Sequence, residues 1–303
     1  MTDRLIHDAH QNMIAPSHKT SPAPITLGHS PDPDDAFMFY ALAKEKISTG
    51  GLRFEHILQD IQTLNERAQR GELDVTAISF HAYPYVAENY ALLPCGASMG
   101  DGYGPMLVSL KSHRLADLPN LRIAIPGKLT SAFLGLQLFM KHSAFRVPHS
   151  AFIVAPFDQI FDAVRNGQAD VGLIIHEGQL TYAQSGFELL LDLGVWWKEQ
   201  TGLPLPLGGN VIRKSFGRKK MKAISDVLAA SIGYGLDHMD EAMPHLKAYA
   251  RDLDEPLTRR FIKMYVNHYT MDYGETGRRA ITEFLKQGAA AGLVPAISKL
   301  EFV

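Results

Sequence analysis

Short apolar runs alternate with amphipathic segments along most of the chain, which is the pattern of an α/β protein. Runs of strand length lie at residues 25–29, 52–58 and 74–80, and helical periodicity fills 36–46 and 61–70 between them. From about residue 221 the strand pattern stops and helical periodicity continues. The amphipathic helices expected there span residues 221–238, 243–251, 256–268 and 275–288.

The order strand, helix, strand, helix, strand recurs 96 residues later without a gap. Strands are expected again at 121–125, 150–154 and 171–175. The matching residues include the glycine that ends a helix and the first part of the strand after it: Gly71, Asp74, Val75 and Ile78 correspond to Gly167, Asp170, Val171 and Ile174. A repeat of this length predicts two lobes of one design. A single continuous Rossmann domain is the competing architecture, but no G-x-G-x-x-G motif follows the first strand of either half.

Two α/β lobes that face one another leave a cleft at the carboxyl ends of their strands, where such sheets bind small ligands. We expect lobe one to comprise residues 24–107 and 211–303, and lobe two to comprise residues 108–210. The chain is expected to cross between them near 104–110 and 204–212, because both stretches combine glycine and proline with extended apolar runs.

Composition excludes several classes of partner. The chain has 303 residues, of which 46% are apolar and 20% charged, with a formal net charge of -2. This is a soluble globular composition that can form two cores, and it favours neither nucleic acid nor an anionic membrane as a partner. Cys95 is the single cysteine, so no internal disulfide is expected. It lacks basic neighbours in the sequence, and we interpret it as a structural or idle thiol.

The first 23 residues are polar and lack the continuous apolar segment of a secretory signal. We expect residues 1–23 to form a flexible leader. No later segment is apolar enough to span a bilayer. The predicted compartment is therefore the cytoplasm, and the sequence does not indicate an oligomeric state.

The strand at 171–175 ends abruptly at His176 and Glu177, at the sheet edge where ligands bind. Since an unperturbed histidine titrates near neutral pH, His176 is a candidate general base. The alternative is a half-buried histidine whose role is structural. Glu177 receives no role, because adjacent side chains rarely face the same way.

Three further polar positions lie at equivalent strand ends or helix starts. Thr130 and Ser131 open a helix, where hydroxyls and free amides can bind a carboxylate, although either residue can also be only a helix cap. Ser79 ends the lobe-one strand that corresponds to the strand before His176. Its alternative is a hydrogen-bonded strand-end serine, and no G-x-S-x-G motif indicates a serine hydrolase.

Asp34 and Asp35 occupy the lobe-one turn that corresponds to Thr130 and Ser131. Two carboxylates raise the possibility of a metal site, but no His-x-His, Cys-x-x-Cys or His-Glu-x-x-His spacing accompanies them. We interpret the run as Asx turns and helix capping, and we predict no metal.

Several segments together resemble a known enzyme family. They are Ser30 to Phe37 (SPDPDDAF), Asp60 to Asn65 (DIQTLN), Gly172 to Glu177 (GLIIHE), Asp192 to Trp197 (DLGVWW) and Thr201 to Gly208 (TGLPLPLG). With these segments the chain resembles 1,4-dihydroxy-6-naphthoate synthase, of the futalosine route to menaquinone, from about residue 24 to the end. The resemblance implies an α/β, two-lobed fold like the type II periplasmic binding proteins.

The resemblance also implies an activity and a set of site residues. The substrate is an aromatic carboxylate, cyclic dehypoxanthinyl futalosine, split into 1,4-dihydroxy-6-naphthoate and dihydroxyacetone. His176 takes the place of the family's general base, and the substrate contacts fall on Ala77, Ile78, Ser79, Thr130 and Ser131. No cofactor is implied, because aromatisation drives the cleavage.

The chain departs from the family pattern at two places. Asp32 and Asp34 stand where relatives often have Cys and Asn, and Ala77 stands where they often carry Lys. If that lysine binds the substrate carboxylate, helix-start amides near Thr130 or another cation must replace it. Two other functions are kept open: a solute-binding protein without catalysis, and chorismate dehydratase of the same pathway.

Overall fold

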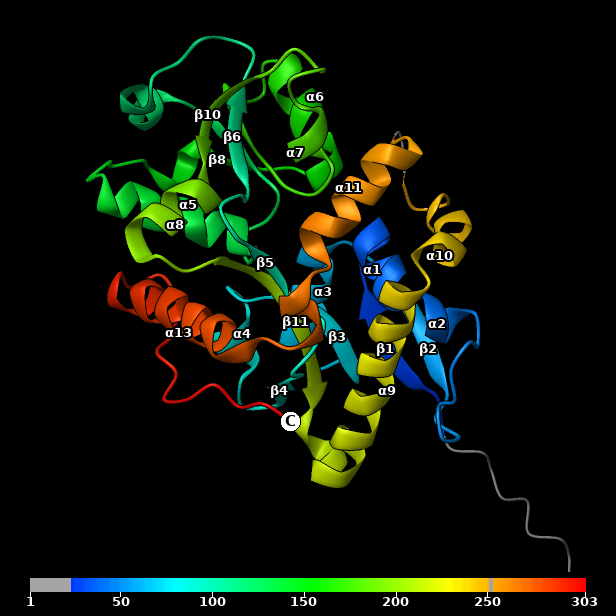
Figure 1. The fold of residues 1–303 in the computed structure, drawn as a ribbon. Helices are drawn as coiled ribbons and strands as arrows, with labels where there is room; N and C mark the ends of the chain where they lie inside the picture. Colours follow the sequence, from blue (N-terminus) through cyan, green and yellow to red (C-terminus); the bar gives the residue numbers. More distant parts are fainter. Residues whose placement is uncertain (1–22, 251–252) are drawn as a thin grey trace, which may run out of the picture.

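The structure is a computed structural model that describes residues 23–250 and 253–303. The leader expected at residues 1–23 lies outside this part of the chain, except for its last residue. Figure 1 shows two lobes, each built around its own β-sheet, with helices packed around the sheets. None of the described helices has the length and the apolar character that crossing a bilayer requires.

The sheet of lobe one has the strand order β2-β1-β3-β11-β4, with β5 paired to β11. β1 pairs in parallel with β2 and β3, whereas β11 runs antiparallel to its neighbours. β3 is buried along its whole length, as expected for a central strand covered on both faces. The strands are β1 Ile25–His29, β2 Phe54–Leu58, β3 Val75–Ser79, β4 Tyr90–Leu92, β5 Ser98–Gly100 and β11 Leu205–Arg213.

The sheet of lobe two repeats this arrangement with the order β8-β7-β9-β6-β10. Again the first three strands are parallel, and an antiparallel strand, β6, follows them. The strands are β6 Met106–Ser109, β7 Ile123–Ile125, β8 Phe152–Val154, β9 Val171–Ile174 and β10 Glu188–Asp192.

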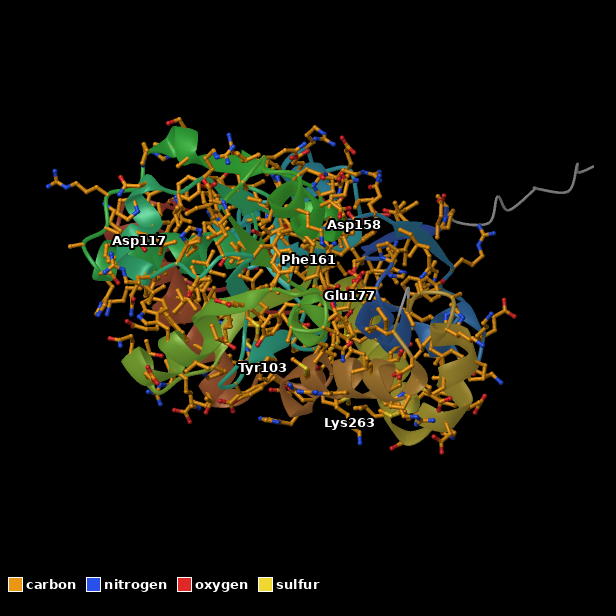
Figure 2. All side chains as sticks on the ribbon, turned by 90° about the horizontal axis from the view of Figure 1, so that it is seen from above. Tyr103, Asp117, Asp158, Phe161, Glu177 and Lys263 are labelled. Carbon is orange, nitrogen blue, oxygen red and sulfur yellow. The ribbon has the colours of Figure 1, made fainter. Side chains whose placement is uncertain are left out.

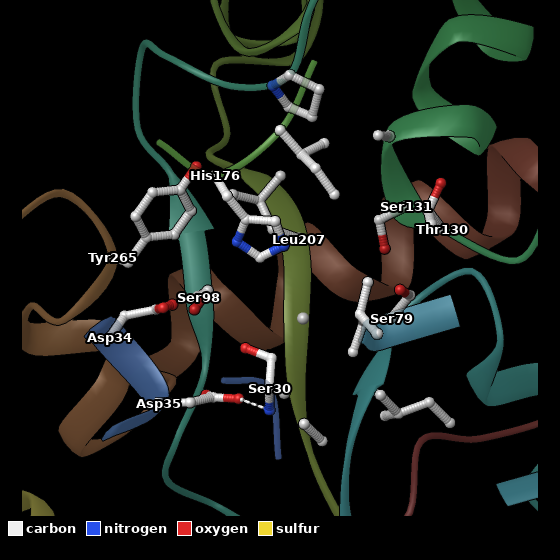
Figure 3. A pocket seen from close by; sticks show the side chains of 18 of the residues that line it. Ser30, Asp34, Asp35, Ser79, Ser98, Thr130, Ser131, His176, Leu207 and Tyr265 are labelled. Carbon is white, nitrogen blue, oxygen red and sulfur yellow. Dashed lines mark hydrogen bonds between the residues drawn. The ribbon is translucent and has the colours of Figure 1, made fainter. Parts of the chain in front are cut away.

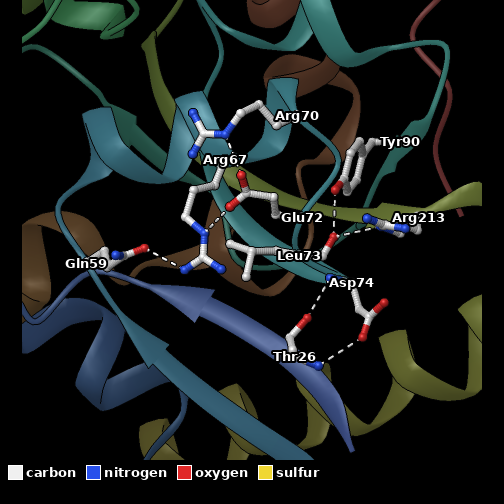
Figure 4. A network of polar contacts seen from close by, with 9 residues as sticks. All are labelled: Thr26, Gln59, Arg67, Arg70, Glu72, Leu73, Asp74, Tyr90 and Arg213. Atoms are coloured by element: carbon white, nitrogen blue, oxygen red, sulfur yellow. Dashed lines mark hydrogen bonds and ion pairs between the residues drawn. The ribbon is translucent and has the colours of Figure 1, made fainter. Parts of the chain in front are cut away.

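The register of the strands confirms the 96-residue repeat. In lobe one Leu27 lies opposite Val75, and in lobe two Ile123 lies opposite Val171, so both partners shift by the same number. Even a side-chain hydrogen bond recurs. Asp74 accepts the Thr26 N–H at 3.0 Å (Figure 4), and Asp170 accepts the Arg122 N–H at 2.8 Å.

The helices of the two lobes begin and end where local chemistry favours it. Asp60 caps α3 by accepting the Thr63 N–H at 3.0 Å, and Gly71 follows α3 with a φ of +65°. Gly167 follows α6 with a φ of +69°. These helices are α3 Ile61–Gln69, α4 Tyr83–Val86, α5 Ser131–His142, α6 Ile160–Arg165, α7 Gly178–Thr181 and α8 Leu193–Thr201, with short 3₁₀ turns at Leu115–Asn120, His149–Ala151, Phe157–Gln159 and Lys214–Phe216.

The first helix differs from the prediction. The sequence predicted one helix at 36–46, whereas the structure has α1 Pro33–Met38 and α2 Tyr40–Ala43. Proline is favoured at the first helical position because its φ is already helical and its missing N–H costs nothing there. The helix therefore begins earlier, inside the run of aspartates.

The C-terminal helices return to lobe one, as predicted, and two of them also contact lobe two. α11 and α9 pack on α1, while α13 packs on both β11 and α5. The ring of Trp197 lies 5.4 Å from that of Phe284, which joins the cores of the two lobes. The helices are α9 Gly217–Asp237, α10 Met239–Leu246, α11 Glu255–Tyr265, α12 His268–Met271 and α13 Gly274–Ala290.

The chain crosses between the two sheets at residues 101–105 and 193–204, because β5 and β11 belong to one sheet and β6 and β10 to the other. Lobe one was expected to end at residue 107 and to resume at residue 211. In the structure the strands of lobe two begin with β6 at Met106, and lobe one resumes with β11 at Leu205. The two crossings touch one another, and the Pro105 carbonyl accepts the Leu193 N–H at 2.9 Å. Seen from above, Tyr103 marks the first crossing (Figure 2).

Substituting Gly194 by alanine is expected to lower the free energy of unfolding by about 1–3 kcal/mol. A Cβ there would overlap the Tyr103 carbonyl, so the two crossings would have to move apart. Urea denaturation measures the change. Gly135→Ala is the matched control, because its Cβ would make only an ordinary contact with Leu193 at 3.7 Å. That variant should gain about 0.5–1 kcal/mol. Equal effects of the two changes would contradict this account of the crossings.

Candidate active site

One pocket lies between the lobes, at the carboxyl ends of the central strands, with about 690 Å³ of space between atoms, part of which is open to solvent. All six residues singled out in the sequence line it: Ala77, Ile78, Ser79, Thr130, Ser131 and His176. Figure 3 shows His176 on one wall and the Thr130–Ser131 turn on the opposite wall, with Ser79 beneath the turn. The repeat thus brings together strand ends and a helix start that are far apart in the sequence. Their roles stay predictions.

His176 lies just beyond the end of β9, on the pocket wall, with 15% of its side chain exposed. Its ring packs 4.8 Å from that of Phe157 and 6.4 Å from that of Tyr265. Its Nδ1 lies 3.4 Å from the Oδ2 of Asp32. Contact of Asp32 with Nδ1 leaves Nε2 as the nitrogen for a ligand.

The backbone of His176 is in the left-handed region, with a φ of +54°. Non-glycine residues rarely adopt this conformation, and it costs about 1–3 kcal/mol where surrounding structure imposes it. Such strain is concentrated at functional sites. The turn after β9 therefore holds the imidazole in a direction that a relaxed backbone would not give it.

The opposite wall is the N-terminus of α5. The Thr130 hydroxyl caps this helix, since it accepts the Phe133 N–H at 3.2 Å and donates to the Gly127 carbonyl at 2.9 Å. The interpretation of Thr130 as a cap is therefore correct as far as its hydroxyl is concerned. The N–H groups of Ser131 and Ala132 belong to the first turn, which has no intrahelical acceptors. An anion in the pocket can accept from them.

The floor of the pocket comes from β3. The Ser79 hydroxyl accepts a hydrogen bond from the side-chain Nδ2 of Asn65 at 3.0 Å, and the Ser79 N–H donates to the side-chain Oδ1 of Asn65 at 2.8 Å. Ser79 is thus a hydrogen-bonded strand-end serine and also a lining residue. Ala77 and Ile78 present only apolar side chains to the pocket. No lysine or arginine is among the described residues that line it.

The turn at residues 30–35 was predicted to consist of Asx turns and helix-capping aspartates, but its aspartates do not cap α1 in the way predicted. Ser30 donates its N–H to Asp35 at 2.6 Å and its hydroxyl to Asp32 at 2.8 Å, which are local turn bonds. Asp32 holds the N-cap position of α1, but its side chain makes no capping bond. Asp34 is 6% exposed and lines the pocket. The capping interpretation was therefore wrong for Asp34, because the helix begins one residue before it.

Contacts between the lobes close the pocket on two sides. On the α5 side, the His81 ring donates to the Thr130 carbonyl at 3.0 Å, and the His81 N–H donates to Ser131 at 3.3 Å. On the His176 side, Gln179 donates to the Tyr265 hydroxyl at 2.6 Å. Seen from above, Glu177 in lobe two lies across from α11, which carries Lys263 (Figure 2).

Four residues that hold or line this site were not predicted from the sequence: Asn65, His81, Gln179 and Tyr265. Burial lowers the pKa of His81 to about 4, so it is neutral and suited to its hydrogen bond with Thr130. Burial raises the pKa of Tyr265 well above its usual range, and Asp34 raises it further. For Asn65, the sequence does carry a signal, because it ends the DIQTLN segment that contributes to the family resemblance.

Asp32, Asp34 and His176 form the polar group of the described residues that most resembles a cation site. One atom from each lies within 4.8 Å of the others. We assign no metal to it. Burial raises the pKa of Cys95 to about 12, which agrees with an idle thiol.

Comparison with solved structures gives the class of fold. A Candida albicans protein described as having the generic periplasmic binding protein fold is 14% identical, with a TM-score of 0.66 over 91% of this chain and 92% of that one. The periplasmic aliphatic sulphonate binding protein of Escherichia coli is 11% identical, with a TM-score of 0.63 over 91% and 90%. The fold is periplasmic-binding-protein-like, as the sequence predicted.

Comparison of sequences gives the family. The model of the menaquinone biosynthesis family matches residues 25–290. The 1,4-dihydroxy-6-naphthoate synthases of Streptomyces coelicolor and Thermus thermophilus are 38% and 36% identical, over 90% and 89% of this chain and 95% of each relative. A crystal structure of an Archaeoglobus fulgidus protein is 41% identical, with a TM-score of 0.82 over 89% of this chain and 98% of that one. The chain belongs to the menaquinone biosynthesis family and to its 1,4-dihydroxy-6-naphthoate synthase branch.

Proposed function

We propose that the chain is a carbon–carbon lyase that converts cyclic dehypoxanthinyl futalosine to 1,4-dihydroxy-6-naphthoate and dihydroxyacetone. Membership of the family supports an enzyme of menaquinone biosynthesis. The observation that carries the proposal is the pairing of His176 with the α5 helix start across one pocket between the lobes. This pairing offers a base and an anion site within the space of one small molecule.

The proposed reaction needs one titrating group to start. His176 takes the proton of a substrate hydroxyl, and the resulting alkoxide collapses to a carbonyl as the adjacent carbon–carbon bond breaks. The electron pair of that bond moves into the conjugated ring carbonyl, and a later elimination gives the aromatic diol. General-base assistance contributes about 10²–10⁴-fold, and the closed pocket adds orientation and exclusion of water.

The substrate carboxylate is proposed to lie at the start of α5. No lysine or arginine lines the described pocket, so the charge must be met by helix-start amides and by the Ser131 hydroxyl. This arrangement takes the place of the lysine that relatives often carry at the position of Ala77. The aromatic part of the substrate would then lie between the α5 turn and His176.

The double substitution Thr130→Ala and Ser131→Ala is expected to raise KM about 10-fold or more, with a smaller effect on kcat. The Ser131 hydroxyl no longer donates to the carboxylate, and the Thr130 cap that holds the helix-start amides in place is lost. Steady-state kinetics measure the change. Thr282→Ala, an exposed threonine of α13, is the control and should leave KM as it is. An unchanged KM in the double variant would show that the Thr130–Ser131 turn only caps the helix and does not bind the substrate.

Turnover of defined compounds tests the proposed function. The purified protein is incubated with cyclic dehypoxanthinyl futalosine, and separately with chorismate, and the products are identified by mass spectrometry. Formation of the naphthoate from the first compound supports the lyase. Binding of that compound without conversion would favour a solute-binding protein, and dehydration of chorismate would favour the sister enzyme.

A further inference from the structure

Asp34 places a second titratable group on the pocket, beside His176. Its carboxyl is 6% exposed and lines the pocket, and its Oδ1 accepts no hydrogen bond from any described residue. One of its oxygens lies within 4.8 Å of a ring nitrogen of His176. Figure 3 shows the two side chains on the same side of the pocket. A ligand that reaches His176 therefore also reaches Asp34.

The acidic groups that face Asp34 oppose a negative charge there, whereas the backbone N–H groups of Asp34 and Asp35 favour one. Asp32 and Asp35 come from its own turn, His176 from the end of β9, and Tyr265 from α11, which packs on α1. Two of these four groups are acidic, and no lysine or arginine lines this described pocket. Burial holds the pKa of Asp34 well above its usual range, and Asp35 and Asp32 raise it further. A carboxyl kept neutral in this way can donate a hydrogen bond or a proton.

We propose that Asp34 is a second catalytic residue, the acid partner of His176, which donates its proton to the substrate oxygen that becomes negatively charged. The inference rests on the proposed lyase function and adds a group to its site. His176 Nε2 takes the proton of the substrate hydroxyl, the alkoxide becomes a carbonyl, and the carbon–carbon bond breaks. The electron pair of that bond moves into the ring system, whose carbonyl oxygen takes the proton of Asp34 and becomes an enol.

This step leaves an imidazolium on His176 and a carboxylate on Asp34, next to one another. Return of the proton from His176 to Asp34 restores both groups, and no other reactant is consumed. Asp32, at 3.4 Å from Nδ1, faces the imidazolium while it exists. In this proposal Asp34 carries a proton before the reaction and His176 does not, because their surroundings differ. Different surroundings are the usual way in which one site provides both a general acid and a general base at neutral pH.

The protonation state of Asp34 is measured first, without substrate. Protein labelled with ¹³C at the aspartate carboxyls is titrated by NMR, and Asp34→Asn identifies the resonance by its loss. We expect one carboxyl that is still protonated at neutral pH and that is missing from the variant. A carboxyl of Asp34 that is ionised at neutral pH would overturn the inference, whatever the turnover.

Kinetics then test the role of the proton. Asp34→Ala is expected to lower kcat about 10²–10⁴-fold with little change in KM. Asp34→Asn, which keeps a hydrogen-bond donor but cannot release a proton, should lose less. In the unchanged protein kcat falls at alkaline pH as Asp34 ionises, and this limb of the pH profile should disappear in Asp34→Asn. A purely structural carboxyl would leave the profile where it is.

The controls distinguish the loss of a catalytic role of Asp34 from misfolding and from failure of the proposed lyase function. Asp158→Asn, at an exposed aspartate, should keep full activity. Thermal melting and circular dichroism show whether the Asp34 variants fold, and Asp34→Asn is nearly identical in shape to the native residue. Full kcat and an unchanged pH profile in folded Asp34→Asn would overturn the inference and leave the lyase intact. Absence of turnover by the unchanged protein would overturn the lyase itself, before any variant is made.

Discussion

Replacing His176 by asparagine is expected to lower kcat about 10²–10⁴-fold, because the reaction loses its general base. Asparagine has no group that accepts a proton near neutral pH. It does tolerate the left-handed backbone, where His176 has a φ of +54°, so the turn after β9 should keep its shape. Substrate binding should survive, because the anion site at α5 is untouched. Steady-state kinetics and calorimetric titration of the substrate measure the two effects.

The matched control for this variant is Glu45→Asn. Glu45 also has a positive φ, of +52°, but it is exposed and lies outside the lining of the pocket. The Glu45→Asn variant should keep the full kcat of the unchanged protein. Activity near that of the unchanged protein in His176→Asn would remove the proposed base. Loss of folding in His176→Asn, with Glu45→Asn folded, would show instead that the imidazole has a structural role.

The second large effect concerns Asp35 and the pH dependence of stability. Burial raises its pKa to about 6, although the Ser30 N–H that it accepts acts in the opposite direction, and Asp32 adds to the rise. In the unfolded chain the ordinary value is 3.8. The native state therefore holds this proton more tightly than the unfolded state does. The contribution of Asp35 to the free energy of unfolding should fall by about 3 kcal/mol as the pH rises from below 3.8 to above 6.

Asp35→Asn removes this titration while an amide oxygen still accepts the Ser30 N–H. Relative to the unchanged protein, the variant should become more stable with rising pH, by about 2 kcal/mol between about pH 4 and about pH 7.5. Urea denaturation at several pH values gives the difference. Asp170→Asn is the control of opposite sign, because the Arg122 ion pair holds the pKa of Asp170 below its usual range. Its effect should appear at more acid pH, as the pH falls below 3.8. A stability difference for Asp35→Asn that does not change with pH would contradict the account.

The repeat made much of the fold predictable from the sequence. An ungapped shift of 96 residues fixes which strands are equivalent, and residues such as Asp74 and Asp170 recur because each accepts a backbone N–H from the neighbouring strand. The start of the first helix was not predicted, because the apolar periodicity begins at Ala36 while the proline at position 33 begins the helix. The periodicity of a short segment does not show where its first turn lies.

The site was predictable only in part, for a physical reason. His176, Ser79 and the Thr130–Ser131 turn follow from the rule that ligands bind at strand ends and helix starts. Gln179 and Tyr265 meet because α11 packs on α1 and brings lobe one against lobe two, and no local pattern encodes that contact. The direction of the Asp34 side chain likewise depends on where α1 begins. Contacts of this kind appear only once the lobes are assembled.

Equimolar release of two products is the most direct test of the account. Purified protein is mixed with cyclic dehypoxanthinyl futalosine, and ¹H NMR follows the substrate, 1,4-dihydroxy-6-naphthoate and dihydroxyacetone with time. We expect the two products to rise together, one for each substrate consumed, over many turnovers. Recovery of the compound unchanged after saturating binding would contradict the claim that this pocket breaks a carbon–carbon bond.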